Sequence, residues 1–210
     1  MSDKWNKSQK YEEQYLESKI NQWNIPFSEK YWLDFMQIDF VALPALEVGC
    51  GNFGMWRFNN SVTGLDPLNF SKLGSNFIQA KAEHIPYKND CFRDVYCINA
   101  LDHAEDPRQS MLEMTRVCSD RLVVWCYIFN KLTRPLLSVA YKPHPHSLTL
   151  DDFIEHGALV PDFMNIEKLK FISPSKEFLK YTKQFIPRAK IQIAELLGME
   201  GLLLHLRKVN

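Results

Sequence analysis

The sequence has no excess of charge of either sign, because its 25 lysines and arginines equal its 25 aspartates and glutamates. Without a global positive field, the composition argues against DNA or RNA as an obligatory partner. The apolar run at 122–129 is far too short to cross a bilayer, and residues 1–19 are polar and charged, without the apolar core of a signal peptide. These absences predict a soluble, cytoplasmic protein without a membrane partner.

The five cysteines contain no C-x-x-C pair, and their number is odd. Two of them lie within apolar, strand-like runs, where a buried thiol behaves as a small core residue. This pattern is typical of reduced thiols in a cytosol and argues against a disulfide or a zinc site, so no metal is predicted. The cysteines are Cys50, Cys91, Cys97, Cys118 and Cys126.

The composition, 46% hydrophobic and 24% charged, is close to the globular average, and 210 residues suffice for one well-buried domain. Residues 4–22 and 28–39 are predicted to be helices, the second opening at Ser28. The short segments that follow are nearly continuous in apolar residues, as buried parallel strands are. These predicted strands are 44–49, 61–66, 77–82, 94–100 and 121–128.

A helix is predicted within 106–119, between the last two of these strands, with Asp106 and Pro107 as its start. Strand, helix and strand in succession predict a doubly wound parallel sheet of the α/β class. The connections after the first two strands are so short that the helices there must be small or partly missing.

The carboxyl-terminal part is predicted to add a short helix and two strands. Residues 149–157 form the helix, with Thr149 and Asp152 as a loose capping box. A stretch between the two strands is too long to be structureless, which predicts a helical insertion. The strands are 165–173 and 200–209, and the insertion covers about 174–197.

A glycine turn with the sequence GCGNFG, residues 49–54, follows the first predicted strand. Glycines at this place let backbone amides approach a ligand. Glu47, two residues before the turn, prefers a cation to a pyrophosphate, which argues against a nicotinamide oxidoreductase. Asp66 ends the next strand, where a carboxylate can accept hydrogen bonds from ribose hydroxyls. Loops also follow the third and fourth strands, at 80–92 and 99–107. Four successive strand ends thus converge on a site suited to a nucleoside with a charged tail.

Four pieces of sequence, LEVGCG, GLD, AEHIPY and LDHAEDP, follow one another at a spacing similar to that of class I S-adenosylmethionine-dependent methyltransferases. The resemblance covers about residues 40–172 and is to the branch that includes quinone-biosynthesis and many small-molecule enzymes. It implies a Rossmann-like, seven-stranded, mostly parallel sheet with the last strand antiparallel. Residues 1–40 would be helices that form a lid or cap on the methyltransferase domain, 41–210.

By this resemblance, the cofactor is S-adenosylmethionine and the product S-adenosylhomocysteine. The first strand and its turn would hold the methionine moiety, the second strand end the ribose, the third the adenine, and a carbonyl after the fourth the ammonium. The residues implied, in that order, are Glu47, Gly49, Cys50 and Gly51; Asp66; Ala82 and Glu83; and Asn99 or Ala100.

Three positions depart from the family pattern. Phe53 stands where a third glycine is usual, Arg93 occupies an acid position with Asp94 shifted by one, and Lys81 replaces the acid that receives the exocyclic amine of adenine. These departures leave open a second hypothesis, a relative that binds the cofactor without transferring a methyl group.

Three histidines are candidates for a general base or for acceptor contact: His103 after the fourth strand, and His144 and His146 after the fifth. A cofactor-site or loop-bracing role for His103, and a plain surface loop for the other two, are the alternatives. Residues 167–190 carry seven lysines and arginines against two glutamates. This excess is either a solvated helical face or a surface for an anionic acceptor.

The favoured hypothesis is methyl transfer to an oxygen, nitrogen or carbon of a small-molecule acceptor, by in-line displacement. A tRNA or protein methyltransferase is the alternative within enzymes, opposed by the neutral charge and by the absence of an added recognition domain. The sequence does not define the acceptor or the oligomeric state.

Overall fold

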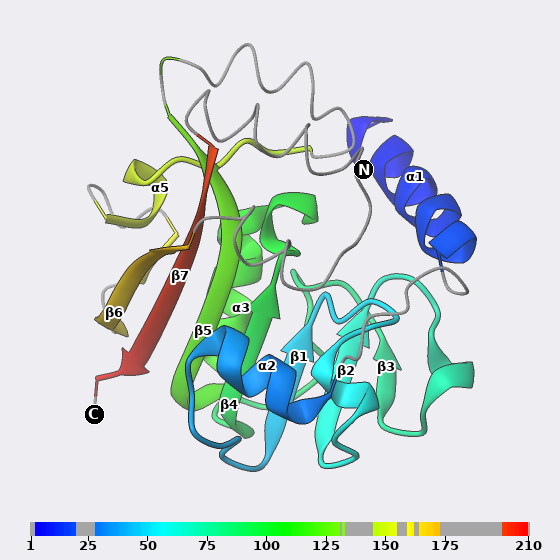
Figure 1. Ribbon diagram of the computed structural model, residues 1–210, viewed down its shortest axis with the longest axis horizontal. Helices are drawn as coiled ribbons and strands as arrows, with labels where there is room; N and C mark the ends of the chain where they lie inside the picture. The colour runs from blue at the N-terminus through cyan, green and yellow to red at the C-terminus, as the bar shows by residue number, and fades with distance from the viewer. Residues whose placement is uncertain are drawn as a thin grey trace.

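Figure 1 shows the computed structural model, which describes residues 3–19, 28–130, 132, 145–154, 159–161, 164–172 and 199–209. Its centre is a seven-stranded sheet in the order β3-β2-β1-β4-β5-β7-β6. The strands are β1 Ala45–Val48, β2 Val62–Asp66, β3 Phe77–Gln79, β4 Phe92–Ile98, β5 Cys118–Phe129, β6 Met164–Ile172 and β7 Met199–Lys208.

The first five strands pair in parallel, and β7 runs antiparallel to both of its neighbours, β5 and β6. The order reverses between β1 and β4, which is the switch point where open α/β sheets bind ligands. The expected α/β, Rossmann-like sheet with an antiparallel last strand is confirmed.

Four helices are described: α1 Asp3–Lys19, α2 Glu29–Met36, α3 Pro107–Val117 and α5 Asp151–Ile154. Only 3₁₀ turns, η1 Met55–Arg57 and η2 Ser71–Leu73, follow β1 and β2, as the short connections predicted, and a third, η3 Leu101–His103, follows β4. The helical insertion expected at about 174–197 lies outside the described residues.

Some predicted bounds were wrong by several residues, each for a local reason. Helix α2 stops at Met36 instead of residue 39, because Gln37 adopts a left-handed conformation (φ 56°) and the Ile38 amide turns back to Leu33. Strand β3 ends at Gln79 instead of residue 82, because its partner β2 ends at Asp66, whose carbonyl accepts the last bond from the Ala80 amide. Strand β5 begins at Cys118 instead of residue 121, where Cys118 pairs with Phe92.

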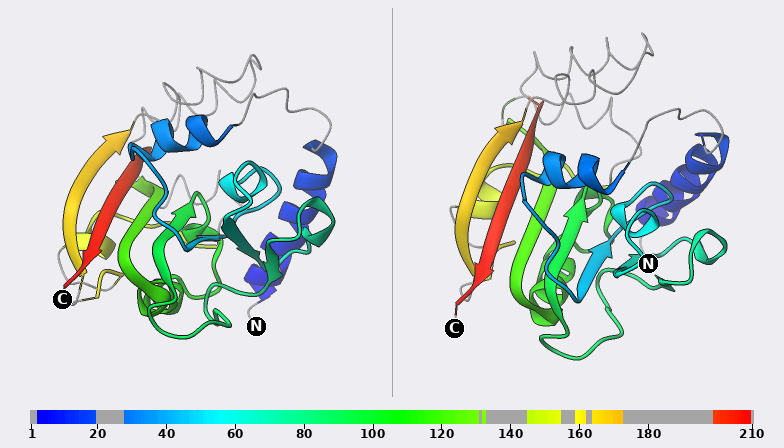
Figure 2. Two further views of the ribbon diagram at one scale, coloured as in Figure 1. Left: turned by 90° about the horizontal axis from the view of Figure 1, so that it is seen from below. Right: turned by 60° about the horizontal axis from the view of Figure 1, so that its bottom comes forward.

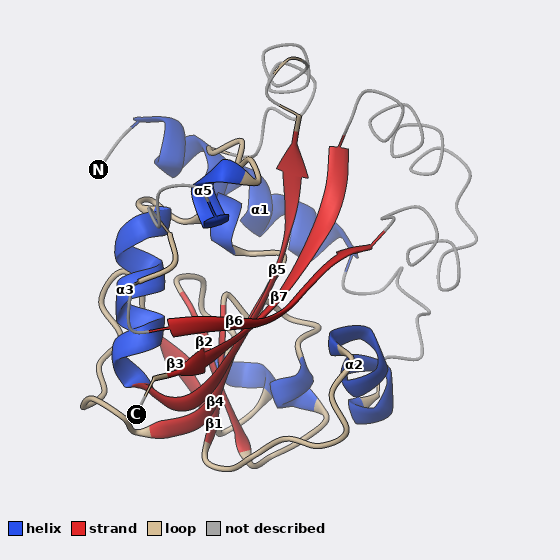
Figure 3. Cartoon of the chain, turned by 90° about the vertical axis from the view of Figure 1, so that its left-hand side faces the viewer, coloured by secondary structure: helices blue, strands red, loops and turns tan. Residues whose placement is uncertain are grey.

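The sheet is covered on both faces, with α3 and α2 on opposite sides (Figure 3). One core cluster contains Met111 and Met114 of α3. The other contains Met36 of α2 together with Trp56 and Trp125. Figure 2 shows α1 on the β3 side of the molecule, away from β6 and β7. The candidate functional site lies at the carboxyl ends of the parallel strands, next to α1.

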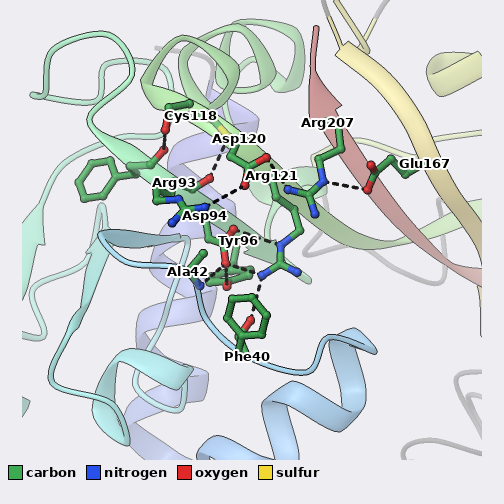
Figure 4. Close-up of polar contacts among 12 residues, drawn as sticks. Phe40, Ala42, Arg93, Asp94, Tyr96, Cys118, Asp120, Arg121, Glu167 and Arg207 are labelled. Atoms are coloured by element: carbon green, nitrogen blue, oxygen red, sulfur yellow. Dashed lines mark hydrogen bonds and ion pairs between the residues drawn. The ribbon is translucent and has the colours of Figure 1, made fainter. Parts of the chain in front are cut away.

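A buried polar network lies at the amino-terminal end of β4 (Figure 4). The Asp94 carboxylate accepts from the Ala42 amide at 2.6 Å, from the Tyr96 hydroxyl at 2.6 Å and from Arg121 Nε at 3.1 Å. Arg121 also donates to the Phe40 carbonyl. Burial raises the pKa of the Tyr96 hydroxyl, which therefore remains a donor. The network joins β4 and β5 to the segment that leads from α2 into β1.

We expect Arg121→Met to lower the free energy of unfolding by about 3–5 kcal/mol, because it leaves the Asp94 carboxylate buried without its cation. Arg93→Met is the matched control: its side chain is 59% exposed and its ion pair with Asp120 is long, at 3.8 Å. The control should stay within about 0.5 kcal/mol of the wild type in urea denaturation. Equal losses in the two variants would contradict a stabilising role for the network.

Candidate functional site

The turn after β1 is shaped by two glycines with positive φ, Gly49 at 66° and Gly51 at 52°. The amides of Gly49 and Cys50 both bond the Leu65 carbonyl, which ties the turn to β2. A Cβ on Gly49 would lie 2.2 Å from the Ala100 Cβ, so only glycine allows the loop after β4 to pack here. A Cβ on Gly51 would meet no atom of the described chain within 4 Å. The turn therefore leaves open space beside Gly51 for a ligand.

Glu47 points its carboxylate into this turn and is only 3% exposed. It accepts a hydrogen bond from the Trp56 amide at 3.0 Å. A Cβ on Gly54 would lie 2.5 Å from Glu47 Oε2, so the third glycine of the turn makes room for the protein's own carboxylate. Burial raises the pKa of Glu47 to about 7. Among the described residues, no ion pair involves Glu47.

Asp66, at the end of β2, is the second buried acid of the site and is 7% exposed. Its two oxygens accept from the Gly51 and Leu68 amides, each at 2.9 Å. Burial raises the pKa of Asp66 to about 6. Asp66 also raises the pKa of Glu47 by charge repulsion. Two neighbouring carboxylates that form no ion pair within the described part of the chain suit a positively charged ligand.

The loop after β4 begins at Asn99, which has a left-handed backbone (φ 55°) and an exposed side chain. Its amide bonds the Trp125 carbonyl at 2.7 Å, which holds this conformation in place. A non-glycine residue with positive φ is most common where the chain makes a special turn or lines a site. Ala100 lies against Gly49 of the glycine turn, and Asn99 precedes it in the chain.

The carboxylate of Glu83 is occupied by the protein itself. It accepts from the amides of Glu105 and Asp106 at 2.7 and 3.0 Å. Asp106 in turn caps α3 by accepting from the Arg108 and Gln109 amides. Ala82, next to Glu83, is half-buried against the core. Glu83 therefore fixes the loop that leads from η3 into α3.

Lys81 forms a cluster with two residues that the sequence reasoning missed. Its Nζ lies 2.8 Å from Glu105 Oε2 and 4.0 Å from the centre of the Trp5 ring. Trp5 Nε1 donates to the His103 carbonyl at 3.2 Å, which places α1 against the loop after β4. The departure at Lys81 was the only sequence signal, and it did not reveal the partners.

Two of the three candidate histidines are brought to the same loop. The His146 amide bonds the Asp102 carbonyl, and His146 Nε2 lies 3.2 Å from the Glu105 carbonyl. Because a carbonyl only accepts, Nε2 carries the proton and Nδ1 is the basic nitrogen. His103 is mostly buried, with Nε2 4.0 Å from Asp102 Oδ1. His144 lies outside the described residues.

All five cysteines are free thiols. Burial raises the pKa of Cys50, which lies in the glycine turn, so its thiol is protonated and inert. Within the described ranges, no three histidine, cysteine or acidic side chains are grouped as metal ligands. No described helix is long and apolar enough to cross a membrane.

Comparison with solved structures shows the fold. The chain is similar to geranyl diphosphate C-methyltransferase from Streptomyces coelicolor A3(2), with 12% identity over 86% of this chain and 79% of that chain and a TM-score of 0.66. It is also similar to the 4+2 cyclase SpnF, with 14% identity over 86% of this chain and 80% of that chain and a TM-score of 0.61. The YcgJ protein from Bacillus subtilis is 13% identical over 86% of this chain and 98% of that chain, with a TM-score of 0.59. At these identities the likeness concerns the fold alone.

No curated protein sequence matches the chain. Residues 46–123 match the family model described as a methyltransferase domain. This segment runs from β1 into β5 and contains the glycine turn, Asp66, Lys81 and η3. Residues 46–123 are thus similar to a methyltransferase domain, and the chain around them has the fold of the solved structures above.

Proposed function

We propose that the protein transfers the methyl group of S-adenosylmethionine to a small-molecule acceptor. The observation that carries the proposal is the pair of buried carboxylates, Glu47 and Asp66, which have no cation partner in the described chain and flank the open space at Gly51. The cofactor brings an ammonium and a sulfonium to a site that would otherwise hold uncompensated negative charge. The charges of Glu47 and Asp66 therefore fit S-adenosylmethionine.

Each site residue has a role in this proposal. Glu47 and the turn Gly49–Gly51 hold the methionine end, and Asp66, which can accept further hydrogen bonds, holds the ribose. Asn99 or Ala100 offers a main-chain carbonyl to the ammonium, and Ala82 borders the adenine. When bound, the cofactor supplies an electrophilic methyl group. The protein orients the acceptor against it and excludes water.

His103 and His146 are the proposed bases for a hydroxyl acceptor. Both lie on or against η3, at the carboxyl end of β4, and His146 presents Nδ1 as its basic nitrogen. A histidine base would remove the acceptor proton as the new bond to carbon forms. Helix α1, docked through Trp5, acts as a lid over this edge.

A small-molecule acceptor is proposed because the net charge is zero, which provides no general attraction for a nucleic acid. The similar geranyl diphosphate C-methyltransferase acts on an anionic small molecule, as its name says. An anionic acceptor would suit the basic residues of 167–190, most of which lie outside the described ranges. The quinone-biosynthesis-like branch is part of this proposal. The second candidate, cofactor binding without methyl transfer, is favoured by SpnF, a cyclase with the same fold.

Calorimetric titration with S-adenosylmethionine and S-adenosylhomocysteine tests the cofactor site. Asp66→Asn should weaken binding by about 1.5–3 kcal/mol, the range for hydrogen bonds to a charged group. Asp34→Asn, an equal change on the exposed face of α2, should leave the affinity unaltered. If the wild type binds neither ligand, the proposed function is wrong.

The pH dependence of stability tests the burial of Glu47. A raised pKa in the folded state means that the associated stability is present below the unfolded pKa of 4.5 and is lost as the pH rises through about 7. Glu47→Gln, which does not titrate, should therefore gain up to about 3 kcal/mol on the wild type between pH 4.5 and 8. The same variant should bind the cofactor more weakly at pH 8. Urea denaturation across this range measures the first effect and calorimetry the second, and parallel stability curves for the two proteins would disprove the burial argument.

Turnover separates the enzyme from a cofactor-binding relative. Formation of S-adenosylhomocysteine should appear with one class in a panel of phenols, amines and prenyl diphosphates. For a hydroxyl acceptor, His146→Asn or His103→Asn should lower kcat about a hundredfold or more near neutral pH, the scale of general-base catalysis. His84→Asn, at an exposed position of the loop after β3, is the matched control. Tight cofactor binding with no product from any acceptor would favour the second candidate.

A further inference from the structure

The Lys81–Glu105 pair is a donor and an acceptor held side by side at the edge of the site. Lys81 comes from the loop after β3 and Glu105 from the loop after η3, and their side chains are each 27% exposed. Solvent therefore reaches part of each side chain. The ion pair itself uses only one donor of the ammonium and one acceptor site of the carboxylate.

The backbone beneath Glu105 is fixed from two directions. Its amide donates to Glu83, and its carbonyl accepts from His146 Nε2. On the other side, Trp5 covers Lys81 and anchors α1 to the His103 carbonyl. A charged pair that several elements hold in place is pre-organised, so it can select a ligand by the positions of its hydrogen-bonding atoms.

The position of the pair follows from Asp66. The Asp66 carbonyl accepts from the amide of Ala80 at 3.1 Å, and Ala80 directly precedes Lys81. Strand β2, which ends at Asp66, is the neighbour of β3. A nucleoside whose ribose is held by Asp66 can therefore direct its base along the β3 side, toward Lys81 and Glu105.

We infer that Lys81 and Glu105 together read the purine base of the bound nucleoside, Lys81 donating to a ring nitrogen and Glu105 accepting from the exocyclic amine. The inference rests on the proposed function. Adenine offers an acceptor nitrogen beside an amine donor, which complements the pair. A 6-oxopurine offers the reverse, a ring N–H beside a carbonyl, and would set donor against donor and acceptor against acceptor. Glu105 thus supplies, from another loop, the carboxylate that position 81 lacks.

Calorimetry with S-adenosylhomocysteine and S-inosylhomocysteine tests the inference. The wild type should prefer the adenosine compound at least about tenfold, the lower scale for sites that pair with a substrate's polar group. The double variant Lys81→Glu/Glu105→Lys keeps an ion pair between the loops but exchanges donor and acceptor, and it should lose most of this preference. Glu105→Gln, which keeps Lys81 and the side-chain shape, should reduce the preference to a smaller extent.

The exchange Lys30→Asp/Asp34→Lys, on an exposed pair of α2, is the control and should leave the preference unchanged. If the pair only fastens the two loops, the exchanged variant at 81 and 105 will keep the wild-type preference, and the inference is overturned while the proposed function stands. An equal affinity of the wild type for both compounds also overturns it. If the wild type binds neither compound, the proposed function itself fails and the inference fails with it.

Discussion

The site is organised around the Glu47 carboxylate, which is buried and forms no ion pair with any residue that the structure describes. Desolvation of an anion is costly, and here a backbone amide of Trp56 compensates only part of that cost. The part of the desolvation cost that is not compensated raises the pKa of Glu47 to about 7. The same carboxylate dictates glycine at position 54, because any side chain there would collide with Oε2. The buried charge of Glu47 lowers the stability of the folded protein, and a positively charged ligand bound beside it would restore that stability.

The loops around this carboxylate are held together by hydrogen bonds within the protein. Glu83 fixes the loop into α3, His146 bonds the Glu105 carbonyl, and Trp5 attaches α1 to the His103 carbonyl. Four segments that are distant in sequence thereby meet at one edge of the sheet. The polar network of Asp94 and Arg121 lies at the other end of β4 and joins the strands to the segment after α2. The candidate site and the Asp94–Arg121 network thus lie at opposite ends of β4.

The departures seen in the sequence have structural explanations in two of three cases. Arg93 is exposed and Asp94 takes the buried position, because the pairing of β4 with β5 shifts in register between Phe92 and Asp94. Lys81 is compensated by Glu105, which follows a different strand. The side chain of Phe53 has no such explanation in the structure. A change at a conspicuous motif position is therefore weak evidence for loss of function until its neighbours in space are known.

The sequence alone determined the strands, their parallel direction and the glycine turn with its acids, since apolar continuity, short connections and chain reversal at glycine are local properties. It also predicted the convergence of Glu47, Asp66 and Asn99, because the carboxyl ends of parallel strands share one edge. Only the tertiary structure decided where α2 and β3 end, that Glu83 serves the loop at Glu105, and that Trp5, Lys81 and Glu105 meet. These features depend on hydrogen bonds and charges between residues far apart in the chain, and no periodicity or motif encodes such partners.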